Sequence, residues 1–221
     1  MSILYIVATP IGNLEDISLR ALRILKEVDF ILCEDTRVTK KLLDKYKIKT
    51  ATLSYFQHSK ISKVNQLIDL LKQRKSLALV SDAGTPGISD PGNKLIESVI
   101  QEIPEVKIEP IPGSCAAIAG LSISGLPTDK FVFYGFLPHK KGKEKILKEI
   151  INNKFTSVFY ESTHRVLKTL HKLNDLGLSK QVVVCRELTK KFETVYRGDI
   201  KQIINQLNNS TTKGEFVVII G

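Results

Sequence analysis

Short runs of apolar and β-branched residues alternate along this chain with longer stretches that show the three-to-four-residue apolar spacing of an amphipathic helix. The runs that we expect to form strands are residues 4–8, 30–33, 77–80, 107–111, 131–136, 157–160, 182–185 and 216–220. Alternation of strands with helix-length segments is typical of α/β domains, in which helices join parallel strands and cover the sheet. The sequence therefore predicts α/β architecture with mostly parallel sheets and flanking helices.

A segment rich in proline and glycine, residues 110–127, separates the expected strands into two groups. Each group is long enough for a sheet of about five strands, which is the usual size. The chain has 221 residues, of which 43% are hydrophobic, so it can supply a core to each group. We therefore expect an N-terminal α/β domain over residues 1–112 and a C-terminal α/β domain over residues 113–221.

Several classes of protein are disfavoured by what the sequence lacks. Its longest uncharged stretch, residues 110–128, is broken by prolines and glycines and is a poor membrane span. No positively charged segment precedes the apolar run at residues 3–8, so we expect no signal peptide. The three cysteines are widely spaced, and the four histidines add no metal-ligand spacing. These features predict a cytoplasmic protein with reduced thiols, no membrane segment and no metal site.

The net charge of +10 is unevenly distributed, with +2 over residues 1–112 and +8 over residues 113–221. A basic half suggests a polyanionic partner such as nucleic acid, because neutralised phosphates release condensed counterions. The alternative is an ordinary solvated surface, since lysine-rich helix faces commonly have no partner. The densest cluster, residues 139–145, follows an expected strand and a Phe-Leu-Pro turn, so we expect it on a rim and not in the core.

Three of the expected strands are followed by loops of glycine, proline and small polar residues, at residues 9–14, 81–92 and 112–117. In a parallel sheet, ligands bind beyond the carboxyl ends of the strands. Glycine and alanine let the main chain approach a ligand closely, and proline restricts loop shape. Three ordinary tight turns are the alternative, but three such loops together favour a cleft lined by backbone groups.

The ligand of these loops can be narrowed by exclusion. No G-x-G-x-x-G follows any expected strand, and residues 87–94 only approximate a phosphate-binding P-loop because Asn93 displaces Lys94. Nucleoside triphosphates and ordinary dinucleotides are therefore disfavoured. A nucleoside-like cofactor held without phosphate clamps remains among the candidates, and S-adenosylmethionine meets that description.

Two arginines, Arg37 and Arg165, stand at expected helix starts, each shortly after a strand and an acidic residue. A cation there faces the positive end of the helix dipole, which is unfavourable. Two explanations remain open. Each arginine either pairs locally, with Glu34, Asp35 or Glu161, or contacts a ligand.

Seven motifs, spread in order over nearly the whole chain, resemble those of one known family. They are residues 8–14, 34–37, 81–92 (S-D-A-G-T-P-G-I-S-D-P-G), 112–114, 160–165, 186–190 and 214–216. The set is similar to the tetrapyrrole methylase, or class III methyltransferase, superfamily, and within it to the enzymes that methylate small-subunit ribosomal RNA. The resemblance implies two α/β domains with a cofactor cleft between them, usually a homodimer, and S-adenosylmethionine as the cofactor. It also implies methylation of the ribose 2′-oxygen of a cytidine in the decoding region of 16S ribosomal RNA.

The resemblance also implies particular cofactor contacts, which it transfers position by position. These are Pro10, Asp82, Ala83, Gly84, Ile88, Ser114, Ala116 and the main chain near Cys185, the last two by superfamily analogy. Longer relatives continue past the position of Gly221 into a small basic extension. Without such an extension, either the lysine-rich half carries more of the RNA binding or the sequence is a truncated form.

A ribose hydroxyl is a weak nucleophile, so transfer of a methyl group to it requires an acceptor for its proton. Acids and histidines on the expected cleft loops are the candidates, and we choose Glu161, His164 and Glu34, with Glu161 ranked slightly above His164. We expect Arg37, Arg165 and Lys190 to hold RNA phosphates. Two alternatives remain: a methyltransferase of the same superfamily that acts on a tetrapyrrole, and an RNA-binding protein without enzymatic activity.

Overall fold

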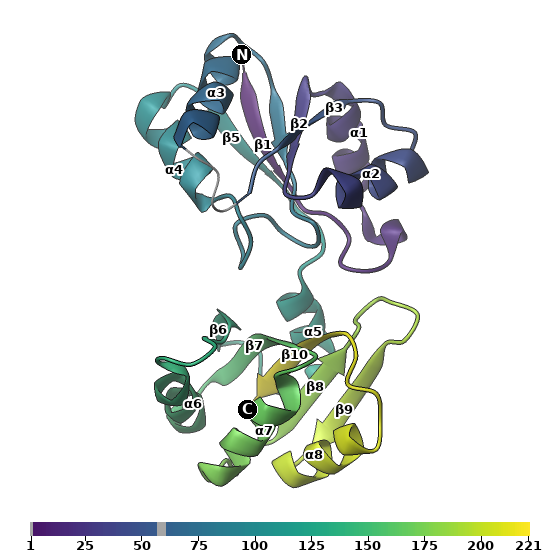
Figure 1. The fold of residues 1–221 in the computed structure, drawn as a ribbon, viewed down its shortest axis with the longest axis vertical. Helices are drawn as coiled ribbons and strands as arrows, with labels where there is room; N and C mark the ends of the chain where they lie inside the picture. The colour runs from purple at the N-terminus through teal and green to yellow at the C-terminus, as the bar shows by residue number, and fades with distance from the viewer. Residues whose placement is uncertain (1, 57–60) are drawn as a thin grey trace. The chain divides into compact units, whose positions relative to one another are not determined.

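The computed structural model describes residues 2–56 and 61–221, and the chain divides into two compact units, Met1–Cys115 and Ala116–Gly221. Each unit is an α/β structure with a five-stranded sheet of its own (Figure 1). The predicted fold class, two α/β domains with flanking helices, is confirmed. Among the described residues, no helix is both long and apolar enough to span a membrane.

The first unit contains a wholly parallel sheet with the strand order β3-β2-β4-β1-β5. Its strands are β1 (Ile3–Val7), β2 (Phe30–Cys33), β3 (Ala51–Ser54), β4 (Leu77–Leu79) and β5 (Lys107–Ile111). Its helices are the 3₁₀ turn η1 (Leu14–Asp16), α1 (Leu19–Glu27), α2 (Thr36–Lys45), α3 (Ile61–Lys72) and α4 (Asn93–Glu102). Side chains cap three of these helices: Asn13 accepts from the Glu15 amide, Ser18 from the Ala21 amide, and Asp35 from the Arg37 amide.

Hydrophobic cores cover both faces of this sheet. Helices α1 and α2 pack with strand residues such as Ile31 and Ala78 on one face, while α3 and α4 pack with Leu32 and Leu77 on the other. Successive strand residues point to opposite faces, so a strand covered on both sides is apolar throughout. The fully buried strand β4 follows this rule.

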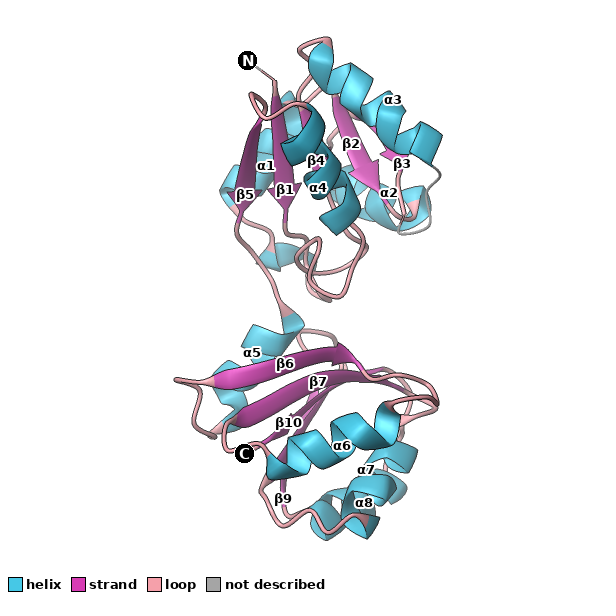
Figure 2. Cartoon of the chain, turned by 90° about the vertical axis from the view of Figure 1, so that its left-hand side faces the viewer, coloured by secondary structure: helices cyan, strands magenta, loops and turns pink. Residues whose placement is uncertain are grey.

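The second unit contains a sheet with the order β6-β7-β10-β8-β9 (Figure 1), of which β6, β7 and β10 follow one another in Figure 2. Its strands are β6 (Phe131–Phe136), β7 (Thr156–Ser162), β8 (Val182–Arg186), β9 (Thr194–Gly198) and β10 (Glu215–Ile220). Its helices are α5 (Ala116–Ser124), α6 (Lys143–Asn152), α7 (Val166–Asp175) and α8 (Ile200–Asn208). Helices α6, α7 and α8 share one core with the sheet, and Gly120 lets α5 approach Val217 and Ile219 of β10 closely.

Strand direction in the second sheet differs from the expected parallel arrangement. Only β6 and β7 pair in parallel, whereas β10 is antiparallel to both β7 and β8, and β8 is antiparallel to β9. The cause is a hairpin between β8 and β9, which reverses the chain so that β10 returns in the opposite direction between β7 and β8. The sequence analysis missed β9, and with it this reversal. It also missed β3, an edge strand without a fully buried residue.

Candidate active site

The loops that follow β1 and β4 are hydrogen-bonded to each other at the carboxyl edge of the first sheet. The Thr9 amide donates to the Gly84 carbonyl at 2.8 Å, and the Gly84 amide donates to the Thr9 carbonyl at 3.0 Å. The Thr9 hydroxyl also donates to the carbonyl of Ser81 at 3.0 Å. β4 and β1 are parallel neighbours in the sheet, and beyond the strands their loops are joined by this isolated antiparallel bridge.

The loop that follows β5 joins the same edge. The Thr85 hydroxyl donates to the Ser114 carbonyl at 3.0 Å, and the Ala8 amide donates to the Ile111 carbonyl at 3.2 Å. A Cβ atom built on Gly113 would lie only 2.9 Å from the Cβ atom of Ala8, so this position accepts glycine alone without a shift. The structure thus brings the three glycine- and proline-rich loops together at one edge of the sheet.

Six of the predicted cofactor contacts belong to these loops. Gly84 and Pro10 are buried, Ser114 is half-buried, and Asp82, Ala83 and Ile88 are exposed. The other two lie in the second unit, where Ala116 begins α5 and Cys185 is fully buried within β8. Burial raises the pKa of the Cys185 thiol to about 11, so this cysteine is an inert core residue.

Acidic side chains border the loop after β4. Glu34 and Asp35 follow β2, the neighbour of β4, and the Asp35 amide donates to Oδ1 of Asp82 at 3.1 Å. Partial burial of Glu34, together with the negative charges of Asp82 and Asp35, raises the pKa of the Glu34 carboxyl above its usual range. This edge therefore favours a cationic ligand and disfavours a phosphate.

Arg37 pairs locally with its helix cap. Its guanidinium group contacts both carboxylate oxygens of Asp35, with Nη2 at 2.6 Å from Oδ2, and this hydrogen bond lowers the pKa of Asp35 to about 2. The pair explains how a cation is tolerated at the start of α2. The Arg37 side chain is nonetheless 88% exposed, so it remains accessible to a ligand.

Glu161, the predicted general base, is the centre of a buried charge cluster in the second unit. Its side chain has no exposed surface; Oε1 accepts from the Ser162 amide at 3.0 Å and lies 3.1 Å from Nε of Arg165. Oε2 accepts from the Thr169 hydroxyl at 2.7 Å and lies 3.4 Å from Nζ of Lys143. A carboxylate that is buried and engaged on both oxygens is suited to holding structure, and this arrangement favours positioning over proton transfer.

Arg165 and Lys143 are the two cations of this cluster, and each makes a further contact that fixes its side chain. Arg165 also donates to the carbonyls of Leu137 and Pro138, so it connects α7 to the segment that precedes α6. This structure therefore shows the local pairing for Arg165 and no free guanidinium for a phosphate. Lys143 departs from the expected rim position of residues 139–145, because its side chain is only 17% exposed and its ammonium group donates to Thr169.

The remaining predicted residues of the second unit lie on its surface. His164 is exposed in the turn between β7 and α7. Lys190 pairs with Oε1 of Glu187 at 3.0 Å and with Oε2 of Glu215 at 2.8 Å. Across residues 2–56 and 61–221, no group of histidine, cysteine and acidic side chains is arranged to hold a metal ion.

Comparison with known proteins shows the family to which this chain belongs. The family model described as Tetrapyrrole (Corrin/Porphyrin) Methylases matches residues 3–204, and the chain belongs to this family. A relative in Halalkalibacterium halodurans, named ribosomal RNA small subunit methyltransferase I, is 48% identical over 98% of this chain and 75% of its own length. A relative of the same name in Thermotoga maritima is 42% identical and covers 100% of this chain and 98% of its own length.

A solved structure supports the fold. Uroporphyrin-III C-methyl transferase from Thermus thermophilus, complexed with S-adenyl homocysteine, superposes with a TM-score of 0.67 over 100% of this chain and 97% of its own. The two sequences are 17% identical, so the likeness concerns the fold.

Sequence reasoning missed several residues that organise these sites. Thr9 and Thr85 lie within the quoted motifs, but their role in joining the loops depends on partners that are distant in sequence. Thr169 carries no signal beyond its helical position, although it contacts both Glu161 and Lys143. Hydroxyls of this kind become recognisable only when strand order is known.

Proposed function

We propose that this protein transfers the methyl group of S-adenosylmethionine to the ribose 2′-oxygen of a cytidine in the decoding region of 16S ribosomal RNA. The observation that carries the proposal is the edge where three loops meet, joined through Thr9–Gly84 and Thr85–Ser114. Family membership and whole-chain relatives named ribosomal RNA small subunit methyltransferase I support the RNA substrate. The net charge of +10 is consistent with a polyanionic partner.

The residues of the edge fit the cofactor. S-adenosylmethionine carries a sulfonium and an ammonium group but no phosphate, which suits a surface bordered by Glu34 and Asp82. Its adenine, ribose and amino-acid parts require donors and acceptors, which exposed loop backbone provides. The residues that would hold it are Pro10, Asp82, Ala83, Gly84, Ile88 and Ser114, with Ala116 and the main chain near Cys185 as weaker contacts. When bound, it supplies an electrophilic methyl group.

The chain's own part is to orient the hydroxyl and to accept its proton. Glu34 is the strongest of the three predicted bases, because it is exposed, borders the cofactor loops and has a raised pKa. His164 remains a second choice from the other unit. Glu161 is better suited to hold Arg165 and Lys143 in place.

The resemblance to the family also supports action in the cytoplasm, as a homodimer, on the assembled small ribosomal subunit. Sedimentation at several protein concentrations tests the dimer. A single species with the mass of one 24.7 kDa chain would rule it out.

The decisive experiment measures methyl incorporation from labelled S-adenosylmethionine into small ribosomal subunits from a strain that lacks the modification. Naked 16S RNA serves as the comparison substrate, and mass spectrometry maps the product. We expect incorporation at the 2′-oxygen of a cytidine. Cofactor binding by calorimetry without incorporation into either RNA would reject the proposed substrate, whereas absence of cofactor binding would reject the methyltransferase activity itself.

A further inference from the structure

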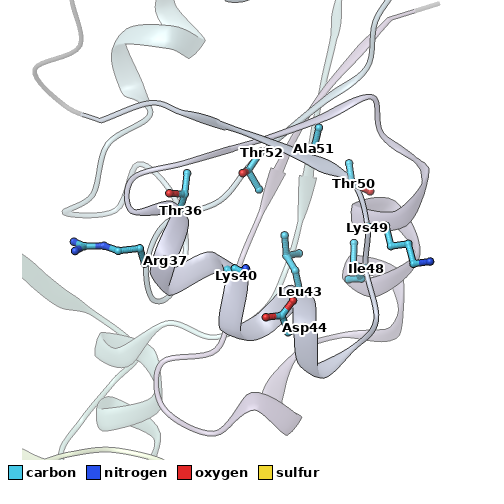
Figure 3. A pocket seen from close by; sticks show the side chains of 10 residues that line it. All are labelled: Thr36, Arg37, Lys40, Leu43, Asp44, Ile48, Lys49, Thr50, Ala51 and Thr52. Carbon is cyan, nitrogen blue, oxygen red and sulfur yellow. The ribbon is translucent and has the colours of Figure 1, made fainter.

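A basic pocket lies beside α2 in the first unit, where the sequence analysis expected little net charge. Its volume is about 420 Å³, and its walls are α2 and the segment that enters β3 (Figure 3). The charged residues of its lining are Arg37, Lys40 and Asp44 on α2 and Lys49 on the opposite segment, so basic residues outnumber the single acid. In Figure 3, Arg37 and Lys49 extend outward at opposite sides of the pocket. Thr36 and Thr52 add hydroxyl groups to the lining.

The exposed face of α2 continues this basic surface. The helix buries Thr39, Leu42 and Leu43 against the core. Its opposite face presents the exposed residues Arg37, Lys40, Lys41, Asp44 and Lys45, which follow the i, i+3, i+4, i+7, i+8 spacing of one helix side. Lys47 and Lys49 are exposed directly after the helix. Asp44 is the single acid among residues 36–49, so this short segment is one of the most basic in the chain.

The lysines of this face lack acidic partners. No ion pair found within residues 2–56 and 61–221 includes Lys40, Lys41, Lys45 or Lys49. On other helices, some basic residues do have an acidic partner one turn away: Arg23 of α1 pairs with Glu27, and Lys148 of α6 pairs with Glu144. Unpaired cations that repel one another are unfavourable unless an external anion neutralises them.

The position of this surface ties it to the cofactor loops. Helix α2 starts immediately after Glu34 and Asp35, and the Asp35 amide is bonded to Asp82 of the loop after β4. An anion bound along α2 would therefore lie beside the edge where methyl transfer is proposed. Neighbouring side chains on a helix face are about 5–6 Å apart, so a chain that carries one charge per nucleotide can contact several of them at once.

We propose that the exposed face of α2 and the adjoining pocket form a docking surface for the phosphate backbone of the substrate RNA. This inference rests on the proposed function and extends it, because it adds Lys40, Lys41, Lys45 and Lys49 to Arg37 as groups that bind RNA. The surface recognises the charge of the backbone and not its sequence. The RNA would then bind to the same unit that carries most of the proposed cofactor contacts.

The test compares two double variants of the full chain that remove equal charge. Lys40→Gln with Lys49→Gln removes the two lysines of the pocket, whereas Lys26→Gln with Lys72→Gln removes exposed lysines of α1 and α3, for which no ion pair is found within the described residues. Affinity for a 16S RNA fragment that spans the decoding region is measured over a series of KCl concentrations. Calorimetry with S-adenosylmethionine reports folding and the cofactor site.

We expect the Lys40/Lys49 variant to bind RNA more weakly and to lower the slope of log affinity against log salt by about 1.4–1.8, which corresponds to two lost phosphate contacts. The control pair keeps the slope of the natural chain, and both variants keep its cofactor affinity. The docking surface is refuted if the pocket variant matches the natural chain, or if the control pair loses as much.

The methylation assay separates this inference from the proposed function. If the natural chain methylates small subunits and the pocket variant binds RNA as well as the natural chain does, the docking surface is wrong and the function stands. Suppose that the natural chain binds the RNA fragment but does not methylate small subunits, and that the pocket variant binds the fragment more weakly. The docking surface is then supported, and the substrate assignment is wrong. If the natural chain does not bind the fragment at any salt concentration, the docking surface is wrong.

Discussion

Glu34 and Glu161 both lie at or near the carboxyl end of a strand, yet the structure gives them opposite surroundings. Glu34 is exposed beside Asp35 and Asp82, whereas Glu161 is buried and holds two cations. Partial burial, together with the negative charges of Asp82 and Asp35, raises the pKa of the Glu34 carboxyl, which makes it a better proton acceptor. Residue type and strand position are the same for both, so our proposal that Glu34 is the base and Glu161 a positioning residue rests on their different partners.

At this scale, we predict that Glu34→Gln lowers the rate of methyl transfer by about 10²–10⁴-fold, the usual contribution of a general base. In the natural chain, the rate should rise as the pH rises through the raised pKa of Glu34, because only the ionised form accepts a proton. The rate of Glu34→Gln should no longer show this rise, which forms the acidic limb of the pH–rate profile. Its unfolding free energy should not fall at neutral pH, since a raised pKa means that folding disfavours the ionised form.

Glu161→Gln is the matched comparison in the pH–rate measurement. This variant should keep the acidic limb and should unfold more easily, by about 3 kcal/mol or more, because Lys143 and Arg165 lose a buried counter-charge. If the rate of Glu34→Gln still rose with pH in the acidic range while that of Glu161→Gln did not, Glu161 and not Glu34 would be the general base.

The next scale is that of the loops and strands. The proposed cofactor edge exists because β4, β1 and β5 are adjacent and because the loops after them touch. Gly113, in the loop after β5, packs closely against Ala8 at the end of β1. Their contact leaves no room for a side chain at residue 113, so the spacing of the two loops requires glycine at this position.

We predict that Gly113→Ala weakens S-adenosylmethionine binding, because the new Cβ atom would lie 2.9 Å from the Cβ atom of Ala8 and must push the loops apart. Calorimetry measures the loss of affinity. The double variant Gly113→Ala with Ala8→Gly removes the clash and should recover much of the affinity. Equal loss in the single and double variants would mean that steric contact is not the cause.

At the scale of the whole molecule, the hydrophobic cores of the two units are separate from each other. Leu95 of α4 belongs to a core of the first unit and Leu173 of α7 to that of the second, and both are fully buried. Because each core is built from residues of one unit, we expect the units to open as distinct cooperative segments.

We predict that Leu95→Ala and Leu173→Ala each cost about 2–5 kcal/mol, confined to the unit that carries the change. Native-state hydrogen exchange should show faster exchange in β1 and β4 for Leu95→Ala, and in β7 and β10 for Leu173→Ala. Equal acceleration of both sheets by either change would show that the molecule unfolds as one cooperative unit.

Local patterns in the sequence were sufficient to predict much of this protein. Eight of the ten strands, the α/β class and the three loops follow from apolar periodicity and from glycine and proline, because these act over a few neighbouring residues. Strands β3 and β9 were not predicted. Strand β3 is a partly exposed edge strand, and β9 has no fully buried residue.

Only the tertiary structure decided which distant residues meet. The insertion of β10 between β7 and β8 makes the second sheet mixed, and the burial of Glu161 against Lys143 and Thr169 depends on residues that are distant in the sequence. The structure likewise shows that the lysines on the exposed face of α2 form no ion pair within the described residues and that two of its basic residues, Arg37 and Lys40, line a pocket. Charge, burial and pairing depend on neighbours brought together by the fold, and local sequence contains no record of them.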